Sequence, residues 1–369
     1  MIGRREFLKT AGVAAPLVGA QPGADELNLW VFSDAHVGTD KRFGRESLAE
    51  ALRHSESDFE WEIGLDLGDM SGGQAAPADE EGEELVRQFR ALKKHRREQI
   101  YNAAGNHDRS GLDEAPNWWW RKWIDPTGEN TAHSGVDAGR RPHAVQGTWE
   151  RYSFRAGNIL FLMMSDINEP SQKVGRGKLG GNPGGVVSGE TFAWWKRMVE
   201  ANQESIIVSA HHYVLKNTTV ASGEYEGCRR DAEGKWVSHY HGCYPEGTPQ
   251  GASYLYWVGG RPDAQAFEKY LEAHPGAVDV WLGGHTHTNP DDTYGGKSHV
   301  ETRWGVHFVN ASALARHHAQ RTTMPMSRPM TLRGDELRIR CYLHTSDHAP
   351  RGWYGRAERT VKLKKRFRR

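Results

Sequence analysis

The sequence predicts an α/β fold in which two mixed β-sheets pack against each other and are flanked by helices. In the first half of the chain, short apolar segments of strand length alternate with segments of helical periodicity. Polar residues follow directly after these apolar segments, where the carboxyl ends of strands usually carry a binding site. In the second half, neighbouring apolar segments are joined by short turns, which favours hairpins and a second sheet.

The expected elements follow one another in a regular order. Strands are expected at residues 27–33, 61–67, 99–103, 149–154, 159–164, 205–210 and 278–282, with further strands between 304 and 340. Helices are expected at residues 46–54, 78–94, 188–198 and 262–273. Residues 110–146 and 217–253 lack regular periodicity, so they are expected to form cap-like loops on one domain of residues 26–369.

Composition limits the classes of partner. The 369 residues, 37% of them hydrophobic, suffice for one large domain with its own core. The net charge of +1 gives no global field that would attract nucleic acid or an anionic membrane. We therefore expect no nucleic-acid partner, and the oligomeric state stays open.

The N-terminus resembles a twin-arginine export signal. Arg4 and Arg5 precede Phe7 and Leu8, and a weakly apolar stretch at residues 11–20 follows. That stretch is too short to span a bilayer, so no transmembrane segment is expected in the mature chain. The pattern predicts a signal peptide at residues 1–25 and a periplasmic or extracellular protein. The alternative is a basic N-terminal helix without a targeting role.

The chain contains three cysteines, and none has the spacing of a zinc site. Cys228 and Cys243 flank one loop and are expected to pair in an oxidising compartment. Cys341 stays unpaired, in a segment that reads as a buried strand.

Five polar clusters follow five of the expected strands. They are Asp34-Ala35-His36, Gly68-Asp69, Gly105-Asn106-His107-Asp108, His211-His212 and Gly284-His285-Thr286-His287. Carboxylate, amide and imidazole groups are ligands suited to Mn, Fe, Zn or Co, and not to thiolate chemistry. Seven plausible ligands exceed the needs of one ion, which favours a site for two metal ions.

The order of these motifs over residues 27–287 resembles the calcineurin-like metallophosphoesterase superfamily. The resemblance implies a four-layer α/β/β/α sandwich and two metal ions. It implies that Asp34, His36 and His287 hold one ion, that Asn106, His211 and His285 hold the other, and that Asp69 bridges them. It also implies that His107 is no ligand and instead contacts the phosphate and protonates the leaving group.

Several residues have two interpretations. His212 is either a structural histidine or a ligand, and Asp108 is a candidate for orienting His107, because Gly72 stands where other branches place a tyrosine or an aspartate. The tryptophans at 118–123 either line a pocket or pack a loop on the domain. The basic end at residues 362–369 is expected to be a solvated tail rather than a polyanion site.

The resemblance predicts hydrolysis of a small phosphate ester. A phosphodiesterase is slightly favoured, because His36 and the Gly105–Asp108 motif resemble that branch. A phosphomonoesterase or nucleotidase on the same site is the main alternative. A nuclease and a non-catalytic binding protein of the same fold are less favoured, because every expected ligand and the catalytic histidine are present.

Overall fold

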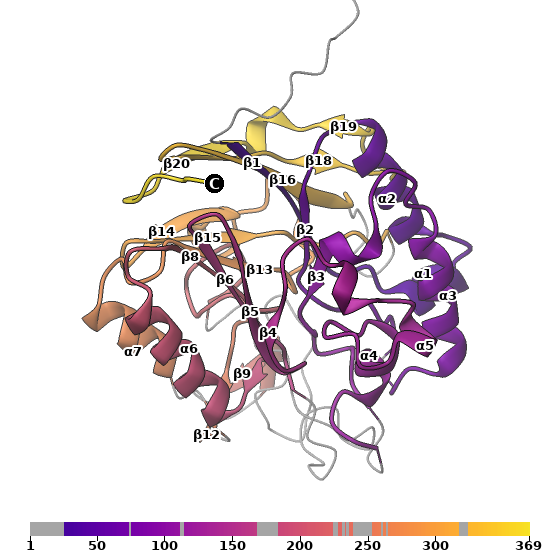
Figure 1. Cartoon of the computed structure of the whole chain (residues 1–369), viewed down its shortest axis with the longest axis horizontal. Coiled ribbons are helices and arrows are strands. Elements are labelled where there is room, and N and C mark those ends of the chain that lie inside the picture. Colours follow the sequence, from indigo (N-terminus) through magenta and orange to yellow (C-terminus); the bar gives the residue numbers. More distant parts are fainter. Residues whose placement is uncertain are drawn as a thin grey trace, which may run out of the picture.

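The computed structural model contains two β-sheets that pack face to face, with helices on the outer face of each (Figure 1). The structure describes residues 26–73, 75–110, 114–167, 184–223, 228–230, 233, 236–238, 253–259, 261–262, 265–316 and 324–369. The predicted signal peptide and Cys243 lie outside these residues, so the signal and the Cys228–Cys243 disulfide stay predictions.

The first sheet has eight strands and combines the N-terminal and C-terminal parts of the chain. Its strands are β1 (Glu26–Phe32), β2 (Ile63–Asp66), β3 (Ile100–Asn102), β16 (Met326–Arg333), β17 (Glu336–Ile339), β18 (Tyr342–Leu343), β19 (Gly352–Trp353) and β20 (Arg359–Lys362). The first three strands are parallel to one another, and β16 pairs antiparallel with β1. The carboxyl ends of β1, β2 and β3 therefore meet at one edge.

The second sheet has seven strands in the order β14-β15-β13-β8-β6-β5-β4. These are β4 (Gln146–Gly147), β5 (Arg151–Ala156), β6 (Ile159–Met164), β8 (Ile206–Ala210), β13 (Val280–Gly283), β14 (Val300–Arg303) and β15 (Val306–Asn310). Short strands form two smaller ladders: β7 (Val186–Val187), β11 (Trp257–Val258) and β12 (Arg261–Pro262) in one, and β9 (Cys228–Arg230) and β10 (Trp236–Ser238) in the other. The expected hairpin is β5–β6, and β8 and β13 are parallel neighbours.

Helices cover both outer faces. Beside the first sheet lie α1 (Val37–Arg42), α2 (Ser47–Ser57), α3 (Asp79–Phe89), α4 (Trp118–Trp123) and α5 (Thr131–Ser134), and beside the second lie α6 (Gly189–Ala201) and α7 (Ala266–Ala273). The 3₁₀ helices are η1 (Arg97–Gln99), η2 (Ala138–Arg140), η4 (Tyr294–Gly296) and η5 (Gly355–Ala357). One apolar cluster fills the space between the sheets, and one lies beneath each helical layer. The predicted fold class is confirmed. No helix in the described part of the chain is long and apolar enough to cross a membrane.

The tryptophan run at 118–123 packs on the domain. Trp119, Trp120 and Trp123 are buried beneath the first helical layer, while Trp118 is 36% exposed. Three of these four side chains therefore belong to the core, which supports the packing interpretation.

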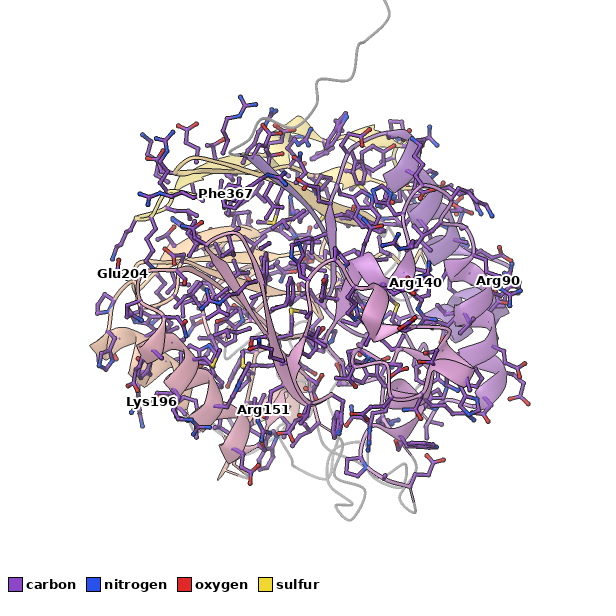
Figure 2. All side chains as sticks on the ribbon, in the orientation of Figure 1. Arg90, Arg140, Arg151, Lys196, Glu204 and Phe367 are labelled. Atoms are coloured by element: carbon purple, nitrogen blue, oxygen red, sulfur yellow. The ribbon has the colours of Figure 1, made fainter. Side chains whose placement is uncertain are left out.

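The expectation of a solvated C-terminal tail is wrong. Strand β20 pairs with β17, and Leu363 and Phe367 are buried in the cluster between the sheets. Figure 2 labels Phe367. Lys365 forms an ion pair with Asp279 at 2.9 Å. The two apolar residues are four positions apart in the basic segment. Their side chains are buried, while most of the basic side chains around them stay exposed to solvent.

Candidate metal centre

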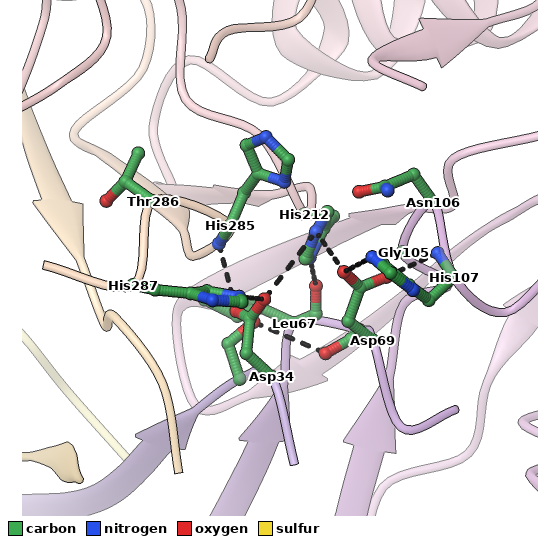
Figure 3. A network of polar contacts seen from close by, with 12 residues as sticks. Asp34, Leu67, Asp69, Gly105, Asn106, His107, His212, His285, Thr286 and His287 are labelled. Atoms are coloured by element: carbon green, nitrogen blue, oxygen red, sulfur yellow. Dashed lines mark hydrogen bonds and ion pairs between the residues drawn. The ribbon is translucent and has the colours of Figure 1, made fainter. Parts of the chain in front are cut away.

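Side chains from the carboxyl ends of both sheets meet in one buried cluster (Figure 3). Asp34 and His36 follow β1, Asp69 follows β2, and Asn106 and His107 follow β3. His212 follows β8, while His285 and His287 follow β13. The two sheets touch here, because the backbone N–H of His285 donates to Asp34 Oδ2 at 2.9 Å. The sandwich thus brings together residues separated by more than 200 positions.

The backbone of the cluster is held in an unusual conformation. Five of its residues have positive φ angles: Asp34 (58°), His36 (45°), Asp69 (57°), His285 (69°) and His287 (47°). Residues other than glycine adopt this region rarely, and it costs of order 1–3 kcal/mol for each residue. Such strain concentrates at functional sites, where the surrounding structure aims the side chains at one point.

Asp34, His36 and His287 form one group of possible ligands. His287 Nε2 lies 2.7 Å from Asp34 Oδ1, and His36 Nε2 lies 3.2 Å from His287 Nε2 and 3.5 Å from Asp34 Oδ1. Ligands bonded to one ion at about 2.1 Å in tetrahedral geometry lie about 3.4 Å apart. These spacings therefore fit a single transition-metal ion.

Asp69 lies at the centre of the cluster. Its Oδ1 accepts the backbone N–H of His107 at 2.7 Å. Its Oδ2 lies 3.2 Å from His212 Nε2, 3.9 Å from His36 Nε2 and 3.9 Å from His107 Nε2. One carboxylate oxygen therefore faces imidazoles from both sides, which is the placement required of a bridging ligand.

The second group of possible ligands consists of Asp69, His212 and His285. The sequence favoured His211, but the structure brings His212 into the cluster instead. Adjacent side chains on an extended segment point in opposite directions. A third group of possible ligands, His36, Asp69 and His107, overlaps the other two. His211 accepts the backbone N–H of Tyr213 at Nδ1 and belongs to none of these groups among the described residues.

Main-chain carbonyls orient three of the imidazoles. His36 Nδ1 donates to Ser71 O at 3.0 Å, His107 Nδ1 to Gly73 O at 2.6 Å, and His212 Nδ1 to Leu67 O at 2.9 Å. A carbonyl only accepts, so each Nδ1 carries the proton in the neutral ring and Nε2 presents its lone pair. For His36 and His212 this arrangement is the usual support of a metal-binding histidine.

The segment that supplies two of these carbonyls is held by the buried carboxylate of Asp108 and the half-buried carboxylate of Glu81. Asp108 accepts the backbone N–H groups of Asp69 and Ser71 at 2.8 and 2.9 Å. Glu81, on α3, accepts those of Gly72 and Gly38 at 2.6 and 3.0 Å. The expectation that Asp108 orients the His107 ring is therefore wrong, because Gly73 O occupies that position.

Steric crowding explains why a glycine stands at position 72. A Cβ there would overlap Thr39, and the N–H of Gly72 is bound to Glu81. Sequence reasoning missed Glu81, because a glutamate on a charged helix carries no distinguishing signal.

Asn106 is held by a residue that the sequence analysis did not single out. Its Oδ1 accepts the hydroxyl of Tyr213 at 2.8 Å, and its Nδ2 is buried without a hydrogen-bond partner among the described residues. Tyr213 directly follows the His211-His212 motif. That adjacency was the only sequence signal that could have identified it.

Charges in the cluster compensate one another. Burial alone would raise the pKa of Asp34, but His287 and His212 hold the pKa of that carboxyl well below its usual range. Burial disfavours charge on His212, yet Asp69 and Asp34 outweigh it and raise the pKa of His212 to about 10. Burial and the neighbouring His212 lower the pKa of His211 to about 3. The carboxylates thus require positive charge at this point, which a metal cation would also supply.

The fold and the cluster together define an α/β protein with a buried His/Asp metal-binding centre at the carboxyl ends of its strands. The family model described as calcineurin-like phosphoesterase matches residues 27–289. The chain therefore belongs to the calcineurin-like phosphoesterase family. A comparison with curated proteins gives no match.

Solved structures of similar fold have low sequence identity to this chain. A predicted phosphoesterase from Streptococcus pneumoniae is 10% identical with a TM-score of 0.34, covering 91% of this chain and 98% of that one. Vacuolar protein sorting 29 from Cryptosporidium parvum is 11% identical with a TM-score of 0.34, covering 91% and 98%. A 5′-nucleotidase precursor from Thermus thermophilus is 12% identical with a TM-score of 0.37, covering 92% and 55%.

Proposed function

We propose that this protein is a metal-dependent phosphoesterase with two ions, drawn from Mn, Fe, Zn or Co. The observation that carries the proposal is the position of Asp69 Oδ2, which faces one ligand group through His36 and the other through His212. In the assignment we propose, Asp34, His36 and His287 hold one ion, and Asn106, His212 and His285 hold the other. Asp69 bridges them.

Substitutions at the two adjacent histidines test this assignment. His212→Ala should lose one bound ion, because His212 Nε2 faces Asp69. His211→Ala should keep both ions. His211 Nδ1 accepts the backbone N–H of Tyr213, which places the proton of the neutral ring on Nε2, and His211 belongs to none of the groups of possible ligands. Loss of a hydrogen-bond partner of a metal ligand typically weakens metal affinity about 10–100-fold. Removal of the ligand itself should weaken the affinity by at least about the same factor. Elemental analysis of both purified variants measures the number of bound ions. Loss of an ion from His211→Ala alone would favour His211 as the ligand, as the sequence predicted.

The residues of the chain define how the site can act on a phosphate ester. Two ions bound here would polarise phosphoryl oxygens and lower the pKa of a water molecule between them. Asp69 and Asp34 supply the negative charge that holds such ions close together. His107, oriented by Gly73 O, directs Nε2 toward the cluster. In its imidazolium form, with both ring nitrogens protonated, it would donate the Nε2 proton to the departing oxygen.

The support for a phosphodiesterase over a phosphomonoesterase is the residue at position 36. His36 lies in the first ligand group, as in the phosphodiesterase-like branch of the family. Hydrolysis of matched mono- and diesters by metal-free protein, with each metal added back singly, tests the proposal. Activity on diesters that depends on added metal is the expected result. Faster monoester hydrolysis would favour a phosphatase or nucleotidase, and absence of any hydrolysis would indicate a binding protein.

Two further expectations are part of the proposal. Residues 110–146 and 217–253 would shape the pocket for a small substrate. The chain would be exported through the twin-arginine route, which is supported by Arg4 and Arg5 ahead of Phe7 and Leu8. Replacing both arginines with lysine should leave the precursor in the cytoplasm, and unchanged export would rule this route out.

A further inference from the structure

Tyr213 contacts several ligands of one proposed ion. It lies in the loop after β8, is 2% exposed, and donates its hydroxyl to Asn106 Oδ1 at 2.8 Å. Its ring lies 4.0 Å from the His285 ring, centroid to centroid, at an interplanar angle of 34°. The same ring meets His212 edge-on at 5.1 Å. One buried side chain therefore contacts Asn106, His212 and His285.

The Tyr213 hydroxyl can form a hydrogen bond with the Asn106 side chain in either orientation of the amide. With Oδ1 toward the hydroxyl, Nδ2 is left without a partner among the described residues. Only the amide oxygen can bind a metal ion, so an ion at this site requires the amide to turn its oxygen to the metal. The two ends of the amide have nearly the same shape, so a half-turn about the Cβ–Cγ bond exchanges them, and a hydroxyl can also accept from N–H. The turned amide then donates Nδ2 to Tyr213, and both of its ends are satisfied.

The other ligand group is held by different parts of the chain. His36 is oriented by Ser71 O, and His287 lies against Asp34. Ser71 is in turn held by Asp108. The groups that orient the two sets of ligand side chains thus come from different loops. Asp69 is common to both sets, and the bond from the His285 N–H to Asp34 Oδ2 also links them.

We propose that Tyr213 is a positioning residue that sets the affinity of the ion held by Asn106, His212 and His285, separately from the ion held by Asp34, His36 and His287. This inference rests on the proposed function, since it presumes two ions. Loss of an outer-shell partner typically weakens metal binding 10–100-fold. Tyr213→Phe removes the hydroxyl, leaves the ring in place, and should weaken one ion only.

The experiment is a titration of metal-free protein with Co²⁺, followed by equilibrium dialysis and by the visible absorption of the bound ion. Wild type should take up two ions. Tyr213→Phe should take up the first with unchanged affinity and the second about 10–100-fold more weakly. Excess Co²⁺ should restore kcat with KM for the ester unchanged, a pattern that general loss of structure would not produce. Tyr152→Phe is the matched control, because Tyr152 is similarly buried and its hydroxyl, among the described residues, bonds only the backbone of Asn102.

Introducing Tyr213→Phe into the Asn106→Ala variant tests whether the effect of Tyr213→Phe comes from a general folding defect. Asn106→Ala already removes the amide, so adding Tyr213→Phe there should change the affinity of the weaker ion by less than about two-fold. An equal loss in both backgrounds would overturn the link through Asn106. Two ions bound by Tyr213→Phe with wild-type affinities, or equal weakening of both ions, would overturn the inference while leaving the proposed function intact. Wild type that binds no ions would remove the proposed function and the inference together.

Discussion

Replacing Asp69 with Asn is expected to abolish the paired metal site and most of the activity. Asp69 Oδ2 faces His36 on one side and His212 on the other, and an amide cannot supply the negative charge between two cations. Loss of a metal ion removes several kcal/mol of charge stabilisation, so kcat/KM should fall roughly 10³-fold or more. Elemental analysis should show fewer than two ions for each chain.

Asp166→Asn is the matched control for this prediction. Asp166 is also a buried carboxyl at a strand end, and burial raises its pKa to about 7. Its Oδ2 accepts the backbone N–H groups of Gly185 and Val186, which an amide oxygen can also do. Asp166→Asn should therefore retain both ions. Two tightly bound ions with full activity in Asp69→Asn would show that Asp69 does not bridge.

His107→Ala is expected to slow the hydrolysis of esters, and the loss of rate should be larger for esters whose leaving group depends more on protonation. An alkoxide leaves poorly, whereas a nitrophenolate leaves well without help. General acid catalysis is typically worth roughly 10²–10⁴-fold, and that loss should appear for alkyl esters and shrink for nitrophenyl esters. The structure supports this role, because Gly73 O holds Nδ1 and leaves Nε2 on the side of Asp69.

The measurement is kcat/KM over a series of leaving groups, with metal content verified for each protein. The fall in kcat/KM on the alkaline side, which reflects deprotonation of the acid, should disappear in the variant. The other possibility is that His107 only holds phosphate or stabilises the loop after Asn106. In that case the loss would be equal along the series, and His107 would be an electrostatic contact rather than an acid.

The sequence by itself determined the fold class and most of the candidate site. The strands that precede Asp34, Asp69 and Asn106 could be predicted, because a buried parallel strand appears in the sequence as a continuous apolar run. The polar residues after those runs had to lie together, since the carboxyl ends of neighbouring parallel strands share one edge. The order of the five motifs indicated the family, which the match over residues 27–289 confirms.

Only the tertiary structure decided which atoms face the centre. His211 and His212 are adjacent, and one change of backbone direction exchanges their roles, so residue type alone could not separate them. Glu81 contacts Gly72, 9 positions away in the sequence, and Tyr213 contacts Asn106, 107 positions away. No local sequence pattern identifies either residue. The basic residues around Leu363 and Phe367 made this segment resemble a solvated tail. The structure shows that both apolar side chains fill space between the two sheets. In each case the deciding quantity is the direction of a side chain in the folded chain, which depends on long-range packing and on backbone angles that local sequence does not specify.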